Sequence, residues 1–354
     1  MVDGRFGAEP RVDRIRILVE GVREGIEEGH ARQHTRLCAR ARRRKLQAVC
    51  NGERRMATIG FIGTGSMGGA MARRLQGAGH ALCVCDLRPE ATRALADVGA
   101  EVVATPREVA KRCRIVMTSL PGPPQIEAVV AGADGLLAEA RAGDVHLDLS
   151  TSSWEMVQRI AAQEARAGVH YLDAPVSGGT IGAAQGTLTV MASGDADALA
   201  RVEPLLRAFA RHVFALGAPG TGTLVKLINN AIFLCAGLLA QEGFVLGARA
   251  GLDPRRLLEI LKLSSGGMYA GLVETTLARD FERAFFSLAL AEKDVSLALE
   301  SARDLGVPMP VTRAAHDTYR RAVEQGLGAQ VFFATLQAIE RAAGVEVPKL
   351  GPAA

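Results

Sequence analysis

The chain has 354 residues, of which 48% are hydrophobic and 23% are charged, and its formal net charge is +4. This composition is typical of a soluble globular protein with room for two domains, and it excludes a fibrous or intrinsically disordered chain. The six cysteines form no CxxC pair, so we expect buried free thiols, a reducing cytoplasm and no metal site.

The positive charge is concentrated in residues 1–55, which hold 14 Arg or Lys and eight Asp or Glu, a net charge of +6, while the other residues carry −2. A basic run such as Arg40–Lys45 can bind nucleic acid. We favour instead a partly helical or disordered extension outside the fold. Met56 is a candidate natural start, because the first predicted strand follows it directly. The leader holds too many acidic residues for an organellar transit peptide.

Strands and helices are predicted to alternate from Ala57 onward. A strand at Ala57–Ile62 leads into a glycine loop, a helix at about Ser66–Ala78 and a second strand at Ala81–Cys85. Further strands are predicted at 114–118, 145–149, 169–173 and 188–193, with Ala-rich helical stretches between the earlier ones. This alternation predicts a doubly wound α/β domain with a parallel sheet over residues 56–217.

The strand pattern stops at about Gly217, and the remaining sequence predicts helices. We therefore expect an all-helical domain over 218–345 and a tail over 346–354. The most apolar stretch, Ile232–Leu246, is interrupted by a glutamine and a glutamate. It is too short and too polar to span a membrane, so a buried helix is expected there.

The glycine loop is a GxGxxG motif between an apolar strand and a helix. In such a loop the glycines permit a tight turn, a close approach of the backbone to a pyrophosphate and close packing of helix on strand. The free amides at the helix N-terminus then bind the pyrophosphate. We therefore expect a dinucleotide to contact Gly63, Gly65, Ser66, Met67 and Gly68.

The end of the second strand addresses the choice of dinucleotide. Asp86 lies there, 23 positions after Gly63. A carboxylate at this place accepts hydrogen bonds from the adenosine ribose and repels a 2′-phosphate, so NAD is favoured. Arg88 is close enough in sequence to pair with that phosphate, which leaves NADP as the alternative cofactor.

Four segments, in this order, resemble the 3-hydroxyisobutyrate dehydrogenase family, whose members include tartronate semialdehyde and glyoxylate reductases. They are Gly60–Ala72 around the glycine loop, Asp173–Gly179 (DAPVSGG), Gly220–Asn230 (GTGTLVKLINN) and Glu292–Asp294. The resemblance implies a Rossmann-type domain, then an all-helical domain that builds a homodimer or homotetramer. It also implies that a small hydroxy acid binds between the two domains.

The resemblance also implies the site residues. Lys226, in the GxGxxxK motif, would be catalytic, and Asn230, one helical turn later on the same face, would orient the substrate. The substrate carboxylate would bind Ser177, Gly178 and Gly179. The cofactor would also contact Leu120 and Pro121 after the fourth strand, Thr151 after the fifth, and Lys293. Lysine supplies only six of the 42 basic residues, and two of those six fall on family positions.

The expected reaction is the reversible oxidation of a small 3-hydroxy carboxylate to its semialdehyde with NAD, in which Lys226 takes the proton. Reduction of tartronate semialdehyde, glyoxylate or succinic semialdehyde with NADPH is the alternative. Two other classes are a catalytically silent scaffold with a nucleic-acid-binding leader and an imine reductase, and the presence of Lys226 argues against both. Departures from the family at Val331 and Met268–Tyr269 are expected near the substrate or the subunit contact, so the substrate stays open.

Overall fold

The structure is a computed structural model that describes residues 58–282 and 285–350, apart from the side chains of 268–273. The basic leader (residues 1–55), the candidate start at Met56 and the last four residues of the expected tail lie outside the described residues.

The described part of the N-terminal domain is built on one nine-stranded sheet. Its strands are β1 (Ile59–Ile62), β2 (Leu82–Cys85), β3 (Glu101–Val102), β4 (Ile115–Thr118), β5 (Val145–Asp148), β6 (His170–Asp173), β7 (Val176–Ser177), β8 (Leu188–Gly194) and β9 (Ala210–Ala215). Their order is β3-β2-β1-β4-β5-β6-β8-β7, and β9 pairs with β8. The first six strands are parallel, while β8 runs antiparallel to β6 and β7. The predicted doubly wound parallel sheet is confirmed for the first six strands, whereas the strand predicted at 188–193 joins the sheet antiparallel to β6.

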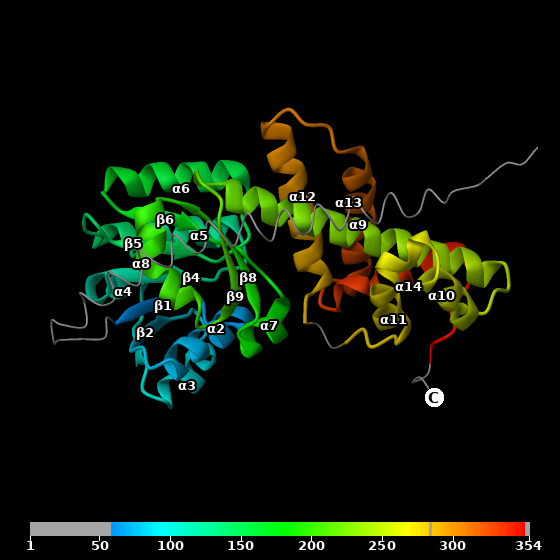
Figure 1. Cartoon of the computed structure of the whole chain (residues 1–354), viewed down its shortest axis with the longest axis horizontal. Helices are drawn as coiled ribbons and strands as arrows, with labels where there is room; N and C mark the ends of the chain where they lie inside the picture. The colour runs from blue at the N-terminus through cyan, green and yellow to red at the C-terminus, as the bar shows by residue number, and fades with distance from the viewer. Residues whose placement is uncertain (1–57, 283–284, 351–354) are drawn as a thin grey trace, which may run out of the picture. The chain divides into compact units, whose positions relative to one another are not determined.

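Helices cover both faces of this sheet (Figure 1). They are α2 (Ser66–Gly77), α3 (Pro89–Ala96), α4 (Pro106–Arg112), α5 (Pro123–Ala131), α6 (Trp154–Arg166), α7 (Gly179–Gln185) and α8 (Ala196–Leu206), with a short 3-10 helix, η1 (Leu136–Ala138). Successive strand residues point to opposite faces. Leu82 and Val84 therefore pack under α2, α3, α7 and α8, while Cys83 and Cys85 face α4, α5 and α6. Both cysteines are buried free thiols, as expected.

The strand order reverses between β1 and β4, which are neighbours in the sheet. In open α/β sheets, ligands bind beyond the carboxyl ends of the strands at such a reversal. The loop after β1 holds the glycine motif, and the loop after β4 holds Leu120 and Pro121. The fold therefore brings two of the predicted cofactor segments to one edge.

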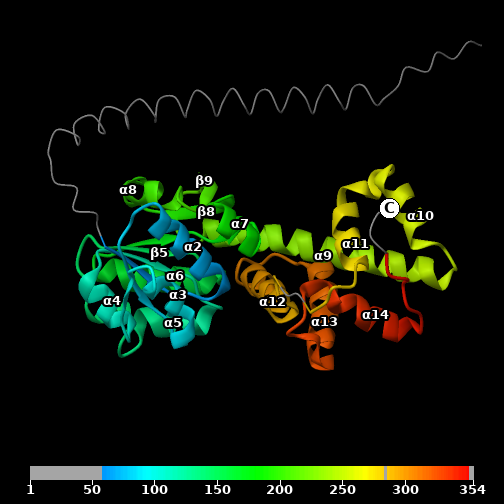
Figure 2. The same ribbon diagram turned by 90° about the horizontal axis from the view of Figure 1, so that it is seen from below.

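The C-terminal domain is helical. It contains α9 (Thr221–Arg249), α10 (Pro254–Lys262), α11 (Ala270–Leu277), α12 (Leu288–Asp304), α13 (Pro310–Ala322) and α14 (Thr335–Ala343), with short helices η2 (Ser265–Tyr269), η3 (Val323–Leu327) and η4 (Phe332–Ala334). Figure 2 shows α12, α13 and α14 along one side of α9, against which they pack. The core between them includes Leu234, Phe244 and Tyr319.

Helix α9 is longer than the apolar stretch that predicted it. By length and composition it is able to cross a membrane, yet the core helix of a soluble protein passes the same test. Because it packs against α10, α11, α12, α13 and α14, we identify it as the core helix of the domain. The expectation of a buried helix holds for one face only, since Ile232, Leu239 and Leu246 on the other face are 60%, 68% and 72% exposed.

Candidate active site

The glycine loop after β1 has the close packing that its sequence predicts. Gly63 has a positive φ of 85°, and a Cβ there would lie 2.3 Å from the Ser119 carbonyl oxygen. A Cβ on Gly68 would lie 1.9 Å from the Gly63 carbonyl oxygen. Any side chain at either position would therefore displace the backbone.

The start of α2 has no side-chain cap. Ser66 and Met67 lie in its first turn, and its N-cap, Gly65, has no side chain that could cap the first amides. By contrast, Ser153 caps α6 and Asp195 caps α8 through their side chains. The first amides of a helix need partners, and a pyrophosphate supplies them. The residues of this loop thus fit a dinucleotide.

Asp86 is hydrogen-bonded to the glycine loop. Its Oδ2 accepts a hydrogen bond from the Thr64 amide at 2.8 Å, and its Oδ1 accepts one from the Arg88 amide at 2.9 Å. The Arg88 Nε lies 3.7 Å from the same Oδ1. A Cβ on Gly65 would lie 3.1 Å from the Arg88 guanidinium. Both groups that bear on the choice between NAD and NADP are therefore adjacent to the loop.

Lys293 on α12 contacts both of the other predicted cofactor loops. Its Nζ donates to the Pro121 carbonyl at 2.9 Å and to the Thr151 carbonyl at 3.4 Å. The two loops are themselves linked, because the Leu120 amide donates to Ser150 Oγ at 2.9 Å. The structure thus brings Leu120, Pro121, Thr151 and Lys293 together.

Lys226 lies in the second turn of α9 and is half-buried. Burial lowers the pKa of its amino group, because desolvation penalises the charged form; the positive charge of Lys293 also lowers it, while the negative charge of Asp294 opposes the change. A lysine with a lowered pKa is able to exchange a proton closer to neutral pH than an exposed one.

Asp294 is a site residue that sequence reasoning missed. The Asn230 Nδ2 donates to Asp294 Oδ2 at 2.6 Å, and Lys293 Nζ lies 3.0 Å from Asp294 Oδ1. The Asn229 side-chain Nδ2 donates to Asn230 Oδ1 at 3.0 Å, so both ends of the Asn230 side chain are held. The only signal for Asp294 in the sequence was its place in the Glu292–Asp294 segment.

The Ser-Gly-Gly segment leaves the sheet at the end of β7. Ser177 is half-buried, and the two glycines after it are exposed. Gly178 and Gly179 have φ values of 127° and 62°, which L side chains rarely adopt. Glycine has no side chain, so neither residue covers its own backbone amide, and both residues are exposed.

Asp173 anchors the start of α9 to the sheet, and its role was also missed from the sequence. Its carboxylate accepts hydrogen bonds from the Thr223 amide at 2.8 Å, the Thr223 hydroxyl at 2.7 Å and the Ser193 hydroxyl at 3.0 Å. A Cβ on Gly222 would lie 2.2 Å from the Met191 carbonyl, so the helix starts in backbone contact with β8. Burial raises the Asp173 pKa to about 6 despite the hydrogen bonds from Thr223.

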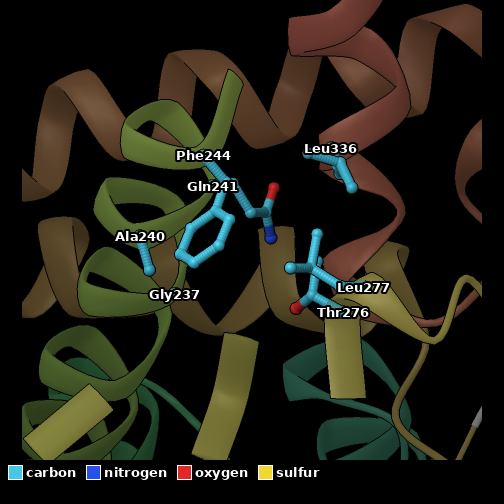
Figure 3. A pocket seen from close by; sticks show the side chains of 7 residues that line it. All are labelled: Gly237, Ala240, Gln241, Phe244, Thr276, Leu277 and Leu336. Carbon is cyan, nitrogen blue, oxygen red and sulfur yellow. The ribbon is translucent and has the colours of Figure 1, made fainter. Parts of the chain in front are cut away.

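Two hollows in the described residues lie away from these groups. One is a cavity of about 10 Å³ in the helical domain, with room for about one water molecule. Figure 3 shows Gln241 and Phe244 at its wall beside Leu277. Gly237 also lines it, and it lies eleven residues, or about 16 Å, along α9 from Lys226. The other, about 650 Å³, is open and lined by charged residues around α4.

Val331 was expected near the substrate or a subunit contact, and that expectation is wrong. Its side chain is fully buried in the core of the helical domain. Its amide donates to the Phe281 carbonyl at 2.9 Å. An apolar residue at this position is therefore explained by packing. The Met268–Tyr269 side chains lie outside the described residues.

Comparisons with known proteins agree with this arrangement. Residues 58–217 match the NAD binding domain of 6-phosphogluconate dehydrogenase. Residues 220–339 match the family described as NAD-binding of NADP-dependent 3-hydroxyisobutyrate dehydrogenase. The chain is 35% identical to 2-(hydroxymethyl)glutarate dehydrogenase of Eubacterium barkeri, over 82% of this chain and 97% of the relative. It is 36% identical to NAD-dependent L-serine dehydrogenase of Pseudomonas aeruginosa, over 78% and 96%.

A solved structure of 3-hydroxyisobutyrate dehydrogenase from Mycobacterium tuberculosis with L-serine has a TM-score of 0.73 and 31% identity to the chain. The match covers 80% of this chain and 99% of that one. Both domains are thus matched in sequence and in fold. The chain belongs to the 3-hydroxyisobutyrate dehydrogenase family and is an NAD(P)-dependent oxidoreductase of hydroxy acids.

Proposed function

We propose that the enzyme reversibly oxidises a small 3-hydroxy carboxylate, of the size of 3-hydroxyisobutyrate, to its semialdehyde with NAD. One observation carries this proposal. Lys293 contacts both cofactor loops, while its neighbour Asp294 holds Asn230, one turn from Lys226. A residue that contacts both cofactor loops is thus adjacent to the residue that holds Asn230, on the helix that carries Lys226.

Each residue has a task in this reaction. Lys226, with its amino group neutral, takes the hydroxyl proton during oxidation and returns it during reduction. Asn230 orients the substrate, and Ser177 with the amides of Gly178 and Gly179 binds its carboxylate. NAD, when bound, supplies the hydride chemistry at the carbinol carbon.

The cofactor contacts follow from the loop geometry. We assign the pyrophosphate to the amides around Gly63, Gly65, Ser66, Met67 and Gly68, at the uncapped start of α2. The adenosine ribose would meet Asp86. The nicotinamide half of the cofactor would pass Leu120, Pro121 and Thr151 and reach Lys293. Lys293 is followed by Asp294, which holds Asn230, so this half of the cofactor would point toward the helix that carries Asn230 and Lys226.

A substrate panel tests the proposal. NADH formation is measured with 3-hydroxyisobutyrate, 3-hydroxypropionate, glycerate, 4-hydroxybutyrate and L-serine, and the reverse reaction with glyoxylate and succinic semialdehyde. We expect the highest kcat/KM for a 3-hydroxy carboxylate with NAD. Higher values for an aldehyde acid with NADPH would favour the alternative reductase activity, and no turnover with any of them would refute the proposal.

We also propose that the enzyme is a homo-oligomer whose contact includes the exposed face of α9. Val225, Ile232, Leu239 and Leu246 recur every seven residues on that face, which makes a stripe about 32 Å long. A second copy fits it, because a two-fold contact uses the same patch on both subunits.

Light scattering of the full chain is the test of that contact. We expect a dimer or tetramer for the natural sequence and a smaller species for Leu239→Asp. Leu305→Asp, on an exposed residue after α12, is the control and should leave the mass unchanged. A monomeric natural chain would contradict the proposal.

Two further parts of the assignment are proposals as well. We place the boundary between the domains at residues 217 and 218, because β9 ends at Ala215 and α9 begins at Thr221. We also propose a cytoplasmic location, which is in keeping with four free cysteines among the described residues.

A further inference from the structure

A row of buried polar side chains crosses the face of the sheet that α6 covers. Thr118 ends β4, His146 and Asp148 lie on β5, and Glu164 lies on α6. These four side chains are almost completely buried, with exposures between 0 and 2%. Burying polar groups is costly unless each has a partner, so the contacts in this row matter.

The hydrogen bonds in the row have a defined direction. The Thr118 hydroxyl donates to Asp148 Oδ1 at 2.9 Å. A hydroxyl has one proton, so its oxygen can only accept from His146 Nε2, which lies 3.0 Å away. Nε2 therefore carries a hydrogen. His146 Nδ1 lies 2.6 Å from Glu164 Oε1, so the imidazole is held at both nitrogens.

The charged neighbours of His146 belong to two elements. Burial by itself lowers the pKa of the imidazole, but the charge of Glu164 on α6, its hydrogen bond and the charge of Asp148 on β5 outweigh burial and raise the pKa. The neighbouring ring of Tyr171 on β6 lies 5.4 Å away, and its hydroxyl donates to Asp148 Oδ2 at 3.4 Å.

The row continues into the cofactor loops. Asp148 Oδ1 also accepts from the Ser150 amide at 3.1 Å. The Ser150 hydroxyl in turn accepts from the Leu120 amide at 2.9 Å. The residues after these two, Thr151 and Pro121, offer their carbonyls to Lys293. An unbroken series of contacts thus connects Glu164 with both loops.

We propose that Thr118 and Asp148, held by the His146–Glu164 pair, are positioning residues that set the two cofactor loops for NAD binding. The inference rests on the proposed function, since it takes these loops to line the cofactor. The row ends at the hydrogen bond that links the two cofactor loops, so it bears on the positions of these loops as well as on the core. Binding groups must be held within a fraction of an ångström, and such supporting contacts hold them.

Thr118→Val tests the row with one atom changed. Valine keeps the shape but leaves His146 Nε2 and Asp148 Oδ1 each without one partner. The free energy of one lost buried hydrogen bond corresponds to about a tenfold change in an equilibrium constant. We therefore expect the Kd for NADH and the KM for NAD to rise about tenfold, with a smaller change in kcat. Thr118→Ser retains the hydroxyl and should stay within about twofold of the natural chain.

The binding readout does not need turnover. Trp154 is the single tryptophan of the chain and begins α6, three residues after Thr151. Energy transfer from Trp154 to bound NADH therefore reports the Kd. Thr92→Val is the matched control, because its buried hydroxyl donates to the Pro89 carbonyl, outside the row. NADH affinity in that variant should be unchanged.

The outcomes separate the possibilities. Natural NADH affinity in Thr118→Val, or an equal loss in Thr92→Val, would overturn the inference. If Thr118→Val does not fold, Ser150→Ala decides, since it removes the acceptor of the Leu120 amide; the inference then requires weaker NADH binding. A different result would refute the proposed function, namely the absence of hydroxy acid turnover by the natural chain. In that case the NADH titration of the variants would still test the positioning role of Thr118 and Asp148.

Discussion

Replacing Asp173 by Asn isolates the effect of the charge on the side chain that anchors helix α9 to the sheet. Asparagine has nearly the same shape. Its oxygen can accept from the Thr223 amide and the Ser193 hydroxyl, as Oδ2 does now. Its amide can donate to the Thr223 hydroxyl, which would rotate to accept. The substitution therefore removes the negative charge while most of the contacts remain.

The structure gives the sign and size of the effect. The Asp173 pKa rises from the usual 3.8 to about 6, because burial and the like charge of Asp148 outweigh the hydrogen bonds from Thr223 and Ser193. A carboxyl with a raised pKa stabilises the fold fully below pH 3.8 and loses that contribution as the pH rises through 6. The full loss is about 3 kcal/mol, of which about 1.4 kcal/mol falls between about pH 5 and pH 8.

Asparagine does not titrate, so the Asp173→Asn chain does not lose this contribution. The unfolding free energy of the variant minus that of the natural chain should therefore be about 1.4 kcal/mol larger at about pH 8 than at about pH 5. Urea unfolding of both chains at the two pH values measures this. Asp144→Asn is the control, since it removes a buried carboxylate paired with Arg114, and it should show no such gain. A stability difference that is the same at both pH values would refute the argument.

Four further outcomes are expected. Lys226→Arg should bind NADH normally but lose about 10²–10⁴-fold in kcat, because arginine cannot give up its proton near neutral pH. Lys111→Arg is the control and should change little. If Lys226→Arg retains more than about a tenth of the natural kcat, Lys226 is not the catalytic residue. The rate of oxidation should increase with pH until Lys226 is deprotonated, at a pKa below 10.5. Because the charge of Asp294 raises this pKa, Asp294→Asn should move the rising part of the kcat/KM profile to lower pH. If that part of the profile does not move, the titrating group is not Lys226. NAD should have a higher kcat/KM than NADP because of Asp86, and the reverse order would give Arg88 control of the adenosine site. A chain that begins at Met56 should fold, bind NADH and turn over, and a large loss of activity would make the leader structural.

The sequence by itself was enough to predict features that depend on neighbouring residues. The apolar runs before and after the glycine loop predicted β1 and β2 to within two residues, because strand formation and the helix start after the loop depend on local spacing. The spacing of Lys226 and Asn230 placed both on one helix. Three strands were not predicted. β3 and β7 have two residues each, and β9 is mostly exposed and is interrupted by Arg211 and His212, so none of them has an apolar run along its whole length.

Only the tertiary structure decided which distant residues share a site. Asp173 and Thr223 are 50 residues apart, Asn230 and Asp294 are 64 apart, and Lys293 reaches Pro121 across 172 residues. No periodicity records such pairings. Each buried carboxylate could have been a surface charge until the packing of helices on the sheet and on one another excluded water from it. Desolvation then required partners for these groups, and the partners that the fold supplied belong to the elements that carry Lys226 and the cofactor loops.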